Sequence, residues 1–346
     1  MTKLRAPKYM GQHTAASILY ESGEWRKVPL LEANEGKLPP NLIVVGDRRR
    51  ADTPTESITS AANHLSTYVD LSAEAQRLCG NKGRVNILVG FYKDHGSDIP
   101  VTIFETQMAM GAQDITLQEA LCLCDPRGYN VADKRLSANE ITVIRVGSCG
   151  GINSDSTDKA IPPVIMIGDL VIGESSFGHS GVIRQRLSGL DYDHPKARGL
   201  FERRWNEMKL KKQGNFLCVD SDLVVVAALL ASARALGHRA HLGNNFSKET
   251  LYCEESDVAD FLALRQIYKA MSTEMEHLGI GFLARYFTLH GVPVRHGLIS
   301  AVVGALPEQS FPRNEAERQQ AAGAESAAMK TALDALWLLS IAANSD

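Results

Sequence analysis

The chain lacks a strong excess of either charge. It has 346 residues with 37 basic and 40 acidic side chains, so its formal net charge is −3. Proteins that bind nucleic acids need a surplus of Lys and Arg to displace counterions from the phosphate backbone. The near balance of charge therefore argues against a nucleic-acid partner and favours a small-molecule ligand.

The chain also lacks a long hydrophobic run. Its longest apolar stretch, residues 223–233, is shorter than the roughly 20 residues that a membrane-spanning helix needs. Residues 1–16 contain no apolar run of the length found in secretory signals. We therefore expect no membrane partner and a soluble protein of the cytoplasm.

Paired cysteines are missing as well. The six cysteines include no Cys-x-x-Cys pair, and Cys122 and Cys124 have no further Cys or His at metal-ligand spacing. The sequence thus predicts neither a metal site nor a disulfide framework. It contains no internal repeat, and its 44% hydrophobic and 22% charged residues are typical of a globular protein with a sizeable core.

A glycine-rich segment after an apolar strand is the most informative feature. Residues 141–144, of which all four are β-branched, predict a buried strand that ends in a loop over Arg145-Val-Gly-Ser-Cys-Gly-Gly-Ile152. Ligands of α/β proteins bind at the carboxyl ends of strands. An arginine, a hydroxyl and bare glycine backbone at this place favour an anion such as phosphate. The segment has neither the P-loop Lys-Ser/Thr nor the dinucleotide fingerprint.

A second strand, residues 41–45, also ends in glycine and positive charge. Gly46 is followed by Asp47 and then by Arg48, Arg49 and Arg50. This arrangement suits a second anion contact at a strand end. The alternative is a solvated basic turn, which a run of arginines alone favours.

Further elements place these two segments in one sheet. Residues 84–92 and 99–106 predict a hairpin. Asp114 can cap a helix that leads into the strand at 141, and a strand, helix, strand order indicates a partly parallel sheet. Further helices are expected from Ser221 or Asp222 to Ala235, within 277–290 and over 321–341, and further strands over 164–172 and 292–303.

The segment Glu274-Met275-Glu276 precedes the helix expected within 277–290. A single carboxylate can accept hydrogen bonds from both hydroxyls of a ribose diol, and a methionine offers an apolar surface for the sugar ring. Arg50 and Arg145 could hold a phosphate through paired donors. The alternative for the two glutamates is a charged helix start, which the helix dipole favours.

Four motifs in this order resemble the nucleoside phosphorylases of the uridine phosphorylase and hexameric purine phosphorylase type. They are Gly46-Asp47-x-x-Arg50, Met110-Gly111, Arg145-Val-Gly-Ser148-Cys149-Gly150 and Glu274-Met275-Glu276. The resemblance spans about residues 41–340. It implies an N-terminal extension, 1–40, and one α/β domain, 41–346, with a central mixed, barrel-like sheet surrounded by helices. It also implies a homodimer, or a hexamer built from dimers, that shares active sites.

The resemblance assigns roles within a cleavage of nucleosides by phosphate, with inorganic phosphate as co-substrate and no metal or organic cofactor. The implied catalytic residues are Arg50, Arg145 and Glu276. The implied phosphate ligands are Gly46, Arg50, Arg145 and Ser148, with Arg84 as the candidate that a neighbouring subunit lends. The implied ribose residues are Glu274, Met275 and Glu276, and the base residues are Cys149, Gly150 and Leu251.

The base side departs from the family pattern. Leu251 stands where the family usually stacks an aromatic ring, although Tyr252 is next to it. The aspartate of the purine branch is missing from Ser300-Ala-Val-Val303, so uridine is the expected substrate. His13 is a candidate for the histidine that a neighbour lends to the sugar. Purine phosphorolysis and a non-catalytic nucleoside-binding protein remain the alternatives.

Overall fold

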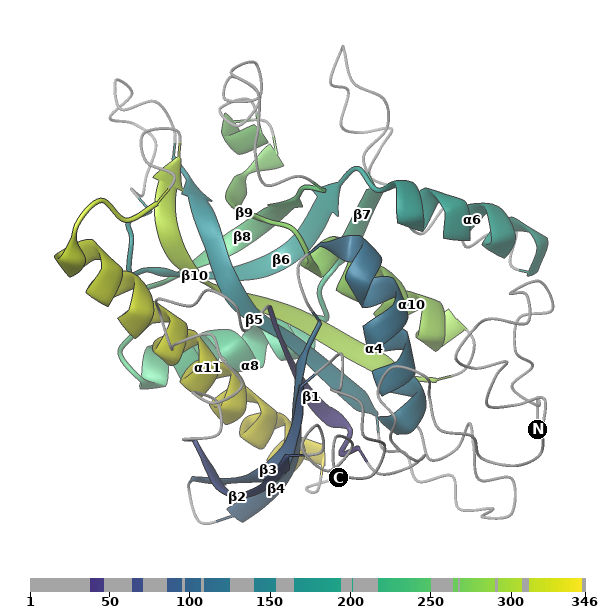
Figure 1. The fold of residues 1–346 in the computed structure, drawn as a ribbon, viewed down its shortest axis with the longest axis horizontal. Helices are drawn as coiled ribbons and strands as arrows, with labels where there is room; N and C mark the ends of the chain where they lie inside the picture. The colour runs from purple at the N-terminus through teal and green to yellow at the C-terminus, as the bar shows by residue number, and fades with distance from the viewer. Residues whose placement is uncertain are drawn as a thin grey trace, which may run out of the picture.

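Figure 1 shows the fold of the chain as a computed structural model. It describes residues 38–46, 64–70, 86–94, 97–106, 109–124, 140–153, 165–193, 201, 217–249, 264–266, 268–289, 292–306 and 311–343. The proposed N-terminal extension, apart from its last residues, therefore lies outside the described part of the chain. Among the described helices, none is long and apolar enough to cross a membrane.

Ten strands of the described residues form one mixed sheet. Five of them, β10, β6, β8, β9 and β5, close into a barrel, because β5 pairs with both β9 and β10. The sheet then continues from β5 through β1, β4 and β3 to β2, and β7 pairs with β6. The barrel-like mixed sheet expected from the sequence is confirmed. The strands are β1 (Asn41–Val45), β2 (Leu65–Asp70), β3 (Ile87–Asp94), β4 (Ser97–Glu105), β5 (Ile141–Ile152), β6 (Leu170–Gly178), β7 (Leu217–Asp220), β8 (Ala240–Ser247), β9 (Ala270–Glu274) and β10 (Val294–Leu306).

Helices cover both faces of this sheet (Figure 1). On one face α8 and α11 pack against each other and against β10, and on the other α4 and α10 pack together. Each face has its own cluster of buried apolar side chains, so the sheet separates two cores. The helices are α4 (Met110–Cys124), α6 (Gly181–Asp193), α8 (Leu223–Ala235), α10 (His277–Leu289) and α11 (Glu315–Ala343).

Local sequence signals account for several boundaries. The Asp222 side chain accepts a hydrogen bond from the Val224 N–H at 3.1 Å and caps α8, and Gly237, with a φ of 74°, follows the helix end. The predicted hairpin forms from β3 and β4, which pair antiparallel. Both predictions are confirmed.

Three predicted boundaries are wrong. The strand expected over residues 164–172 begins only at Leu170 and runs to Gly178. The glycine-rich segment is not a loop, because β5 continues to Ile152 in register with β10. A Cβ on Gly151 would lie 2.7 Å from Ile165 and 3.1 Å from Val302, so the glycine permits close packing in the barrel. Asp114 does not cap a helix, since α4 begins at Met110 and Asp114 accepts a hydrogen bond from Arg186 Nη2 at 2.8 Å.

Candidate active site

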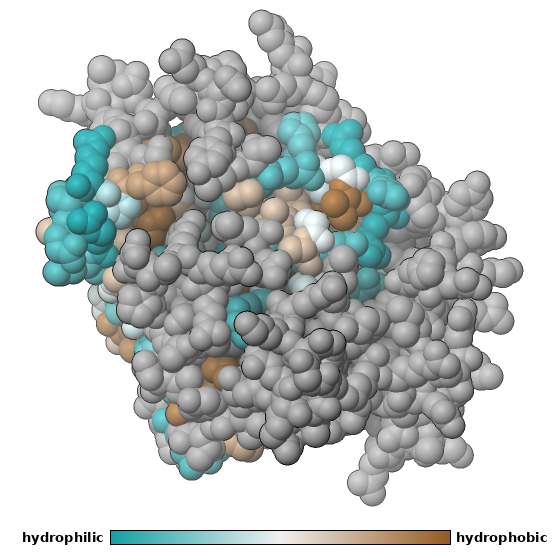
Figure 2. Space-filling view, viewed as in Figure 1, coloured by the Kyte–Doolittle hydropathy of each residue, from teal (hydrophilic) through white to brown (hydrophobic). Residues whose placement is uncertain are grey.

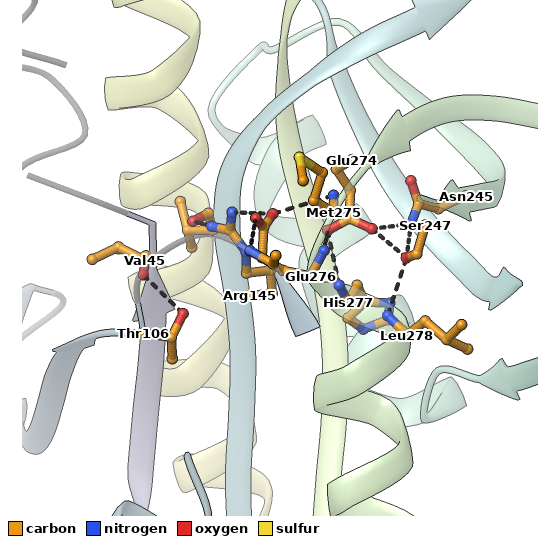
Figure 3. Close-up of polar contacts among 12 residues, drawn as sticks. Val45, Thr106, Arg145, Asn245, Ser247, Glu274, Met275, Glu276, His277 and Leu278 are labelled. Carbon is orange, nitrogen blue, oxygen red and sulfur yellow. Dashed lines mark hydrogen bonds and ion pairs between the residues drawn. The ribbon is translucent and has the colours of Figure 1, made fainter. Parts of the chain in front are cut away.

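The two segments predicted to hold an anion lie next to each other, although only Gly46 follows a strand end and Arg145 lies within β5. β1 and β5 are parallel, and Val44 is the register partner of Arg145. Gly46 directly follows β1, and a Cβ built on it would lie 3.7 Å from Arg145 Nη2. Thr106 continues from here, because its N–H donates to the Val45 carbonyl at 3.1 Å and its hydroxyl donates to the same carbonyl at 3.4 Å, the contact drawn in Figure 3. The sheet thus brings bare backbone and a guanidinium together.

Arg145 is buried, with 4% of its surface exposed, and its guanidinium spans two parts of the site. Nη2 forms an ion pair with Glu276 Oε2 at 2.9 Å, and Nη1 donates to the Val146 carbonyl. The guanidinium occupies the space where a side chain on Gly147 would lie. A glycine at 147 is therefore required for the observed position of the arginine.

Glu276 accepts two hydrogen bonds besides that of Arg145, one from another segment and one from the residue directly before it. Its Oε1 accepts from the Ala109 N–H at 3.1 Å, and its Oε2 accepts from the Met275 N–H at 3.3 Å. Ala109 has a φ of 73°, a left-handed conformation that is costly for a residue with a side chain. The turn before α4 thus adopts a strained shape that directs its N–H to Glu276.

Glu274 has a different environment from Met275 and Glu276. Its Oε2 accepts from the N–H groups of Glu276 and His277, each at 2.8 Å, and so caps the first turn of α10 (Figure 3). Its Oε1 accepts from Asn245 Nδ2 at 2.6 Å and from Ser247 Oγ. Burial, followed by the charge of Glu276, raises the pKa of Glu274. These contacts suit a residue that orients Glu276.

A buried polar network extends below Glu274. Asn245 Nδ2 donates to Ser176 Oγ at 2.9 Å, and Ser176 Oγ lies 2.6 Å from His277 Nδ1. His277 Nε2 lies 3.4 Å from His296 Nδ1. Burial lowers the pKa of His277 well below its usual value and that of His296 to about 3, so both rings are neutral near pH 7. These residues were not identified as a group from the sequence. The polar residues Asn245 and Ser247, two positions apart on one strand, were the pattern that could have indicated a polar face.

The remaining predicted residues divide into two groups. Ser148 and Gly150 are half-buried on β5, whereas Cys149 is buried in an apolar cluster with Ile165, Val171 and Val302. The structure thus places Cys149 in the wall of the barrel. Arg50, Arg84, Leu251 and His13 lie outside the described residues. No group of three or more metal-ligating His, Cys, Asp or Glu side chains occurs in the part of the chain that the structure describes.

The closed barrel brings Gly46 and the Arg145 guanidinium next to the Glu-Met-Glu turn. This combination defines an α/β protein whose polar groups match the chemistry of a phosphate and a sugar. A family model described as the phosphorylase superfamily matches residues 43–334. The chain therefore belongs to this superfamily, as a member of its nucleoside phosphorylase family, and the resemblance drawn from the motifs is confirmed.

Curated relatives are purine nucleoside phosphorylases of the DeoD type. That of Colwellia psychrerythraea is 27% identical over 260 residues, which cover 75% of this chain and 81% of the relative. That of Psychromonas ingrahamii is 30% identical over 138 residues, or 40% of this chain and 43% of the relative. The latter match therefore spans less than half of the relative's length.

Solved structures show the same fold at low identity. Purine nucleoside phosphorylase from Toxoplasma gondii aligns with a TM-score of 0.59 at 16% identity, over 91% of this chain and 98% of that one. Uridine phosphorylase from Vibrio fischeri aligns with a TM-score of 0.60 at 15% identity, over 90% and 97%. Because both kinds of enzyme share this fold, the fold does not distinguish a purine substrate from a pyrimidine substrate.

Proposed function

We propose that this protein is a pentosyltransferase that cleaves the glycosidic bond of a nucleoside with inorganic phosphate. The observation that carries the proposal is the buried Arg145–Glu276 pair, which joins the strand edge suited to an anion to the turn suited to a ribose. The two residues are 131 positions apart in the sequence, and their pairing at 2.9 Å gives the two half-sites one fixed geometry.

The proposed reaction follows from these positions. Phosphate bound by Arg145, Ser148 and the Gly46 backbone, together with Arg50, attacks the anomeric carbon with one of its oxygens. The bond from that carbon to the base nitrogen breaks, and its electron pair leaves with the base, which takes up the proton that the attacking hydrogen phosphate gives up to solvent. The products are ribose 1-phosphate and the free base. The phosphate charge stabilises the cationic sugar that develops, and its fixed position favours attack.

Glu276 serves the sugar in this scheme. A carboxylate has about four acceptor positions, so the observed bonds from Ala109, Met275 and Arg145 leave capacity for a ribose hydroxyl. Met275 is half-buried next to it and supplies apolar contact. We further propose that the protein acts as a dimer or a hexamer of dimers, which light scattering after gel filtration tests.

Uridine is the substrate that we propose first. Ser300, Ala301, Val302 and Val303 lie on β10 without the acidic residue expected of the purine branch. Purine nucleosides are the second candidate, and the names of the curated relatives support it.

The test is an assay of the purified protein with uridine, thymidine, inosine and adenosine, each with and without phosphate. We expect free base and ribose 1-phosphate in equal amounts from uridine, and only when phosphate is present. Release of base from inosine or adenosine but not uridine would favour the purine alternative. Release without phosphate would indicate a hydrolase, and binding of nucleosides without any release would support a non-catalytic protein.

A further inference from the structure

Thr273 on β9 carries a buried hydroxyl whose hydrogen-bonding capacity is unused among the described residues. The residue is 3% exposed, and its Oγ1 has no hydrogen-bond partner in the described part of the chain. The neighbouring Ser272, by contrast, donates to Asn245 Oδ1 at 3.0 Å. A buried hydroxyl without a partner costs stability, so its presence in an otherwise paired segment requires an explanation.

Thr273 lies between two strands that line the candidate site. It is the register partner of Gly150 on β5 and of Phe246 on β8. Its Cγ2 would be 3.3 Å from a Cβ built on Gly150, so the two residues share one face. The next residues along the chain are Glu274, Met275 and Glu276. Thr273 therefore continues the ribose-side turn toward the far part of β5.

The site opens to the surface at this place. Ser148 and Gly150 are half-buried, whereas the other residues of β5 are buried. Met275 and Leu306, from the neighbouring turn and strand, are half-buried as well. Figure 2 shows hydrophobic residues beside the hydrophilic start of α11, in the area where β10 ends in Figure 1. Partly exposed residues thus surround a buried hydroxyl.

We infer that the Thr273 hydroxyl hydrogen-bonds a polar edge of the nucleobase in the bound nucleoside. This inference rests on the proposed function. Ser148, a proposed phosphate ligand, and Gly150 are both half-buried and lie two residues apart on β5, so they face the same side of the strand about 7 Å apart. That length accommodates a pentose with its base extending from the phosphate toward Gly150. A hydroxyl both donates and accepts, so it can pair with a base carbonyl or ring N–H.

The experiment compares Thr273→Val, which removes the hydroxyl at similar volume, with Thr273→Ser, which keeps it. We expect kcat/KM for the preferred nucleoside to fall about tenfold in Thr273→Val, mainly through KM, and to stay within about threefold in Thr273→Ser. The KM for phosphate should not change in either variant. Without ligand, Thr273→Val should unfold at the same temperature as the wild type or higher, because an unpaired buried polar group is gone.

Two results would overturn the inference. One is an unchanged kcat/KM in Thr273→Val, and the other is an equal rise of the KM values for phosphate and nucleoside, which indicates a general distortion. Wild-type protein that releases no base from any nucleoside would refute the proposed function instead. In that case, calorimetry measures how tightly the wild type and Thr273→Val bind uridine and inosine. If the variant binds each nucleoside as tightly as the wild type does, the role of Thr273 is overturned.

Discussion

Two buried pairs on the same barrel differ in what surrounds them. Arg145 and Glu276 meet at 2.9 Å beside Gly46 and Gly147, where bare backbone lies at the strand edge. Asp169, before β6, meets His241 on β8 at 2.8 Å, and the same Oδ2 accepts from the Met166 N–H at 3.0 Å. The first pair joins the two parts of the candidate site, whereas the second connects the turn before β6 to β8.

Burial of an acidic side chain against a basic partner does not by itself mark a functional site. Both pairs are largely removed from water, and structural pairs of this kind are common. What distinguishes the Arg145 pair is the glycine backbone beside it and the strained N–H of Ala109 directed at it. Substitutions in the two regions should therefore separate loss of activity from loss of stability.

The largest effect is expected from Arg145→Met. The proposed phosphate site loses its buried guanidinium, so kcat/KM should fall about a thousandfold. Glu276 would remain buried without its partner, which should lower the free energy of unfolding by about 3–5 kcal/mol. Activity assays and urea denaturation measure the two effects.

A double variant and a control separate the two effects of Arg145→Met. Arg145→Met with Glu276→Gln should regain stability and remain inactive. Arg295→Met, which breaks a partly exposed pair with Glu140, should change neither quantity much. Phosphate-dependent turnover at the wild-type rate in Arg145→Met would contradict the assigned role.

A smaller effect is expected from Gly147→Ala. The added methyl would occupy the space of the Arg145 guanidinium and displace it. The KM for phosphate should rise about tenfold, as for a charged hydrogen bond that is lost. The matched control is Gly323→Ala on α11, where a Cβ meets nothing within 4 Å and the helix should gain about 0.5–1 kcal/mol. An unchanged phosphate KM in Gly147→Ala would argue against phosphate binding by Arg145.

Asp169→Ala should affect stability and leave activity unchanged. It removes the acceptor of His241 and of the Met166 N–H, so the free energy of unfolding should fall by about 1–3 kcal/mol. The kcat/KM of the folded protein should stay within about twofold of wild type. Asp98→Ala, which removes an exposed partner of Lys93, is the control and should cost less than about 1 kcal/mol. A large loss of activity would place Asp169 in the functional site after all.

The smallest effect concerns pH and the histidines below the site. Burial lowers the pKa of His296 to about 3, below the unfolded value near 6.5. As pH falls, His296 is therefore protonated in the unfolded state before it is protonated in the folded state. Its contribution to the free energy of unfolding is complete above pH 6.5 and is lost progressively as pH falls toward 3. The slope is at most about 1.4 kcal/mol per pH unit. Denaturation of wild type and His296→Asn between pH 7 and 5 should show a shallower slope in the variant, and parallel slopes would contradict this account.

The sequence predicted the motifs of the site better than the contacts between them. Strand ends at Gly46 and Arg145 were expected near one another, and the parallel pairing of β1 and β5 brings them together. The loop predicted over residues 145–152 was wrong, because barrel closure depends on pairing with β10, about 150 positions away, which local pattern does not reveal. Pairing between Arg145 and Glu276 was not predicted for the same reason.

Local pattern gave the role of Glu274 only as an alternative, a carboxylate at a helix start, and its bonds to the N–H groups of Glu276 and His277 confirm that alternative. Its motif suggested a sugar contact, but Asn245 and Ser247 from a neighbouring strand hold its carboxylate at the start of α10. These partners become visible only once β8 and β9 are known to be parallel neighbours. Similarly, Asp114 has the residue type of a helix cap, yet an arginine on α6 provides its partner.

The junction at Glu274 has one more consequence. It is the last residue of β9 and also the cap of α10, so strand register and helix start are set by the same side chain. An insertion of one residue between 273 and 276 would turn alternate side chains to the other face and separate Glu276 from Arg145. A change in chain length at this junction should therefore be rejected.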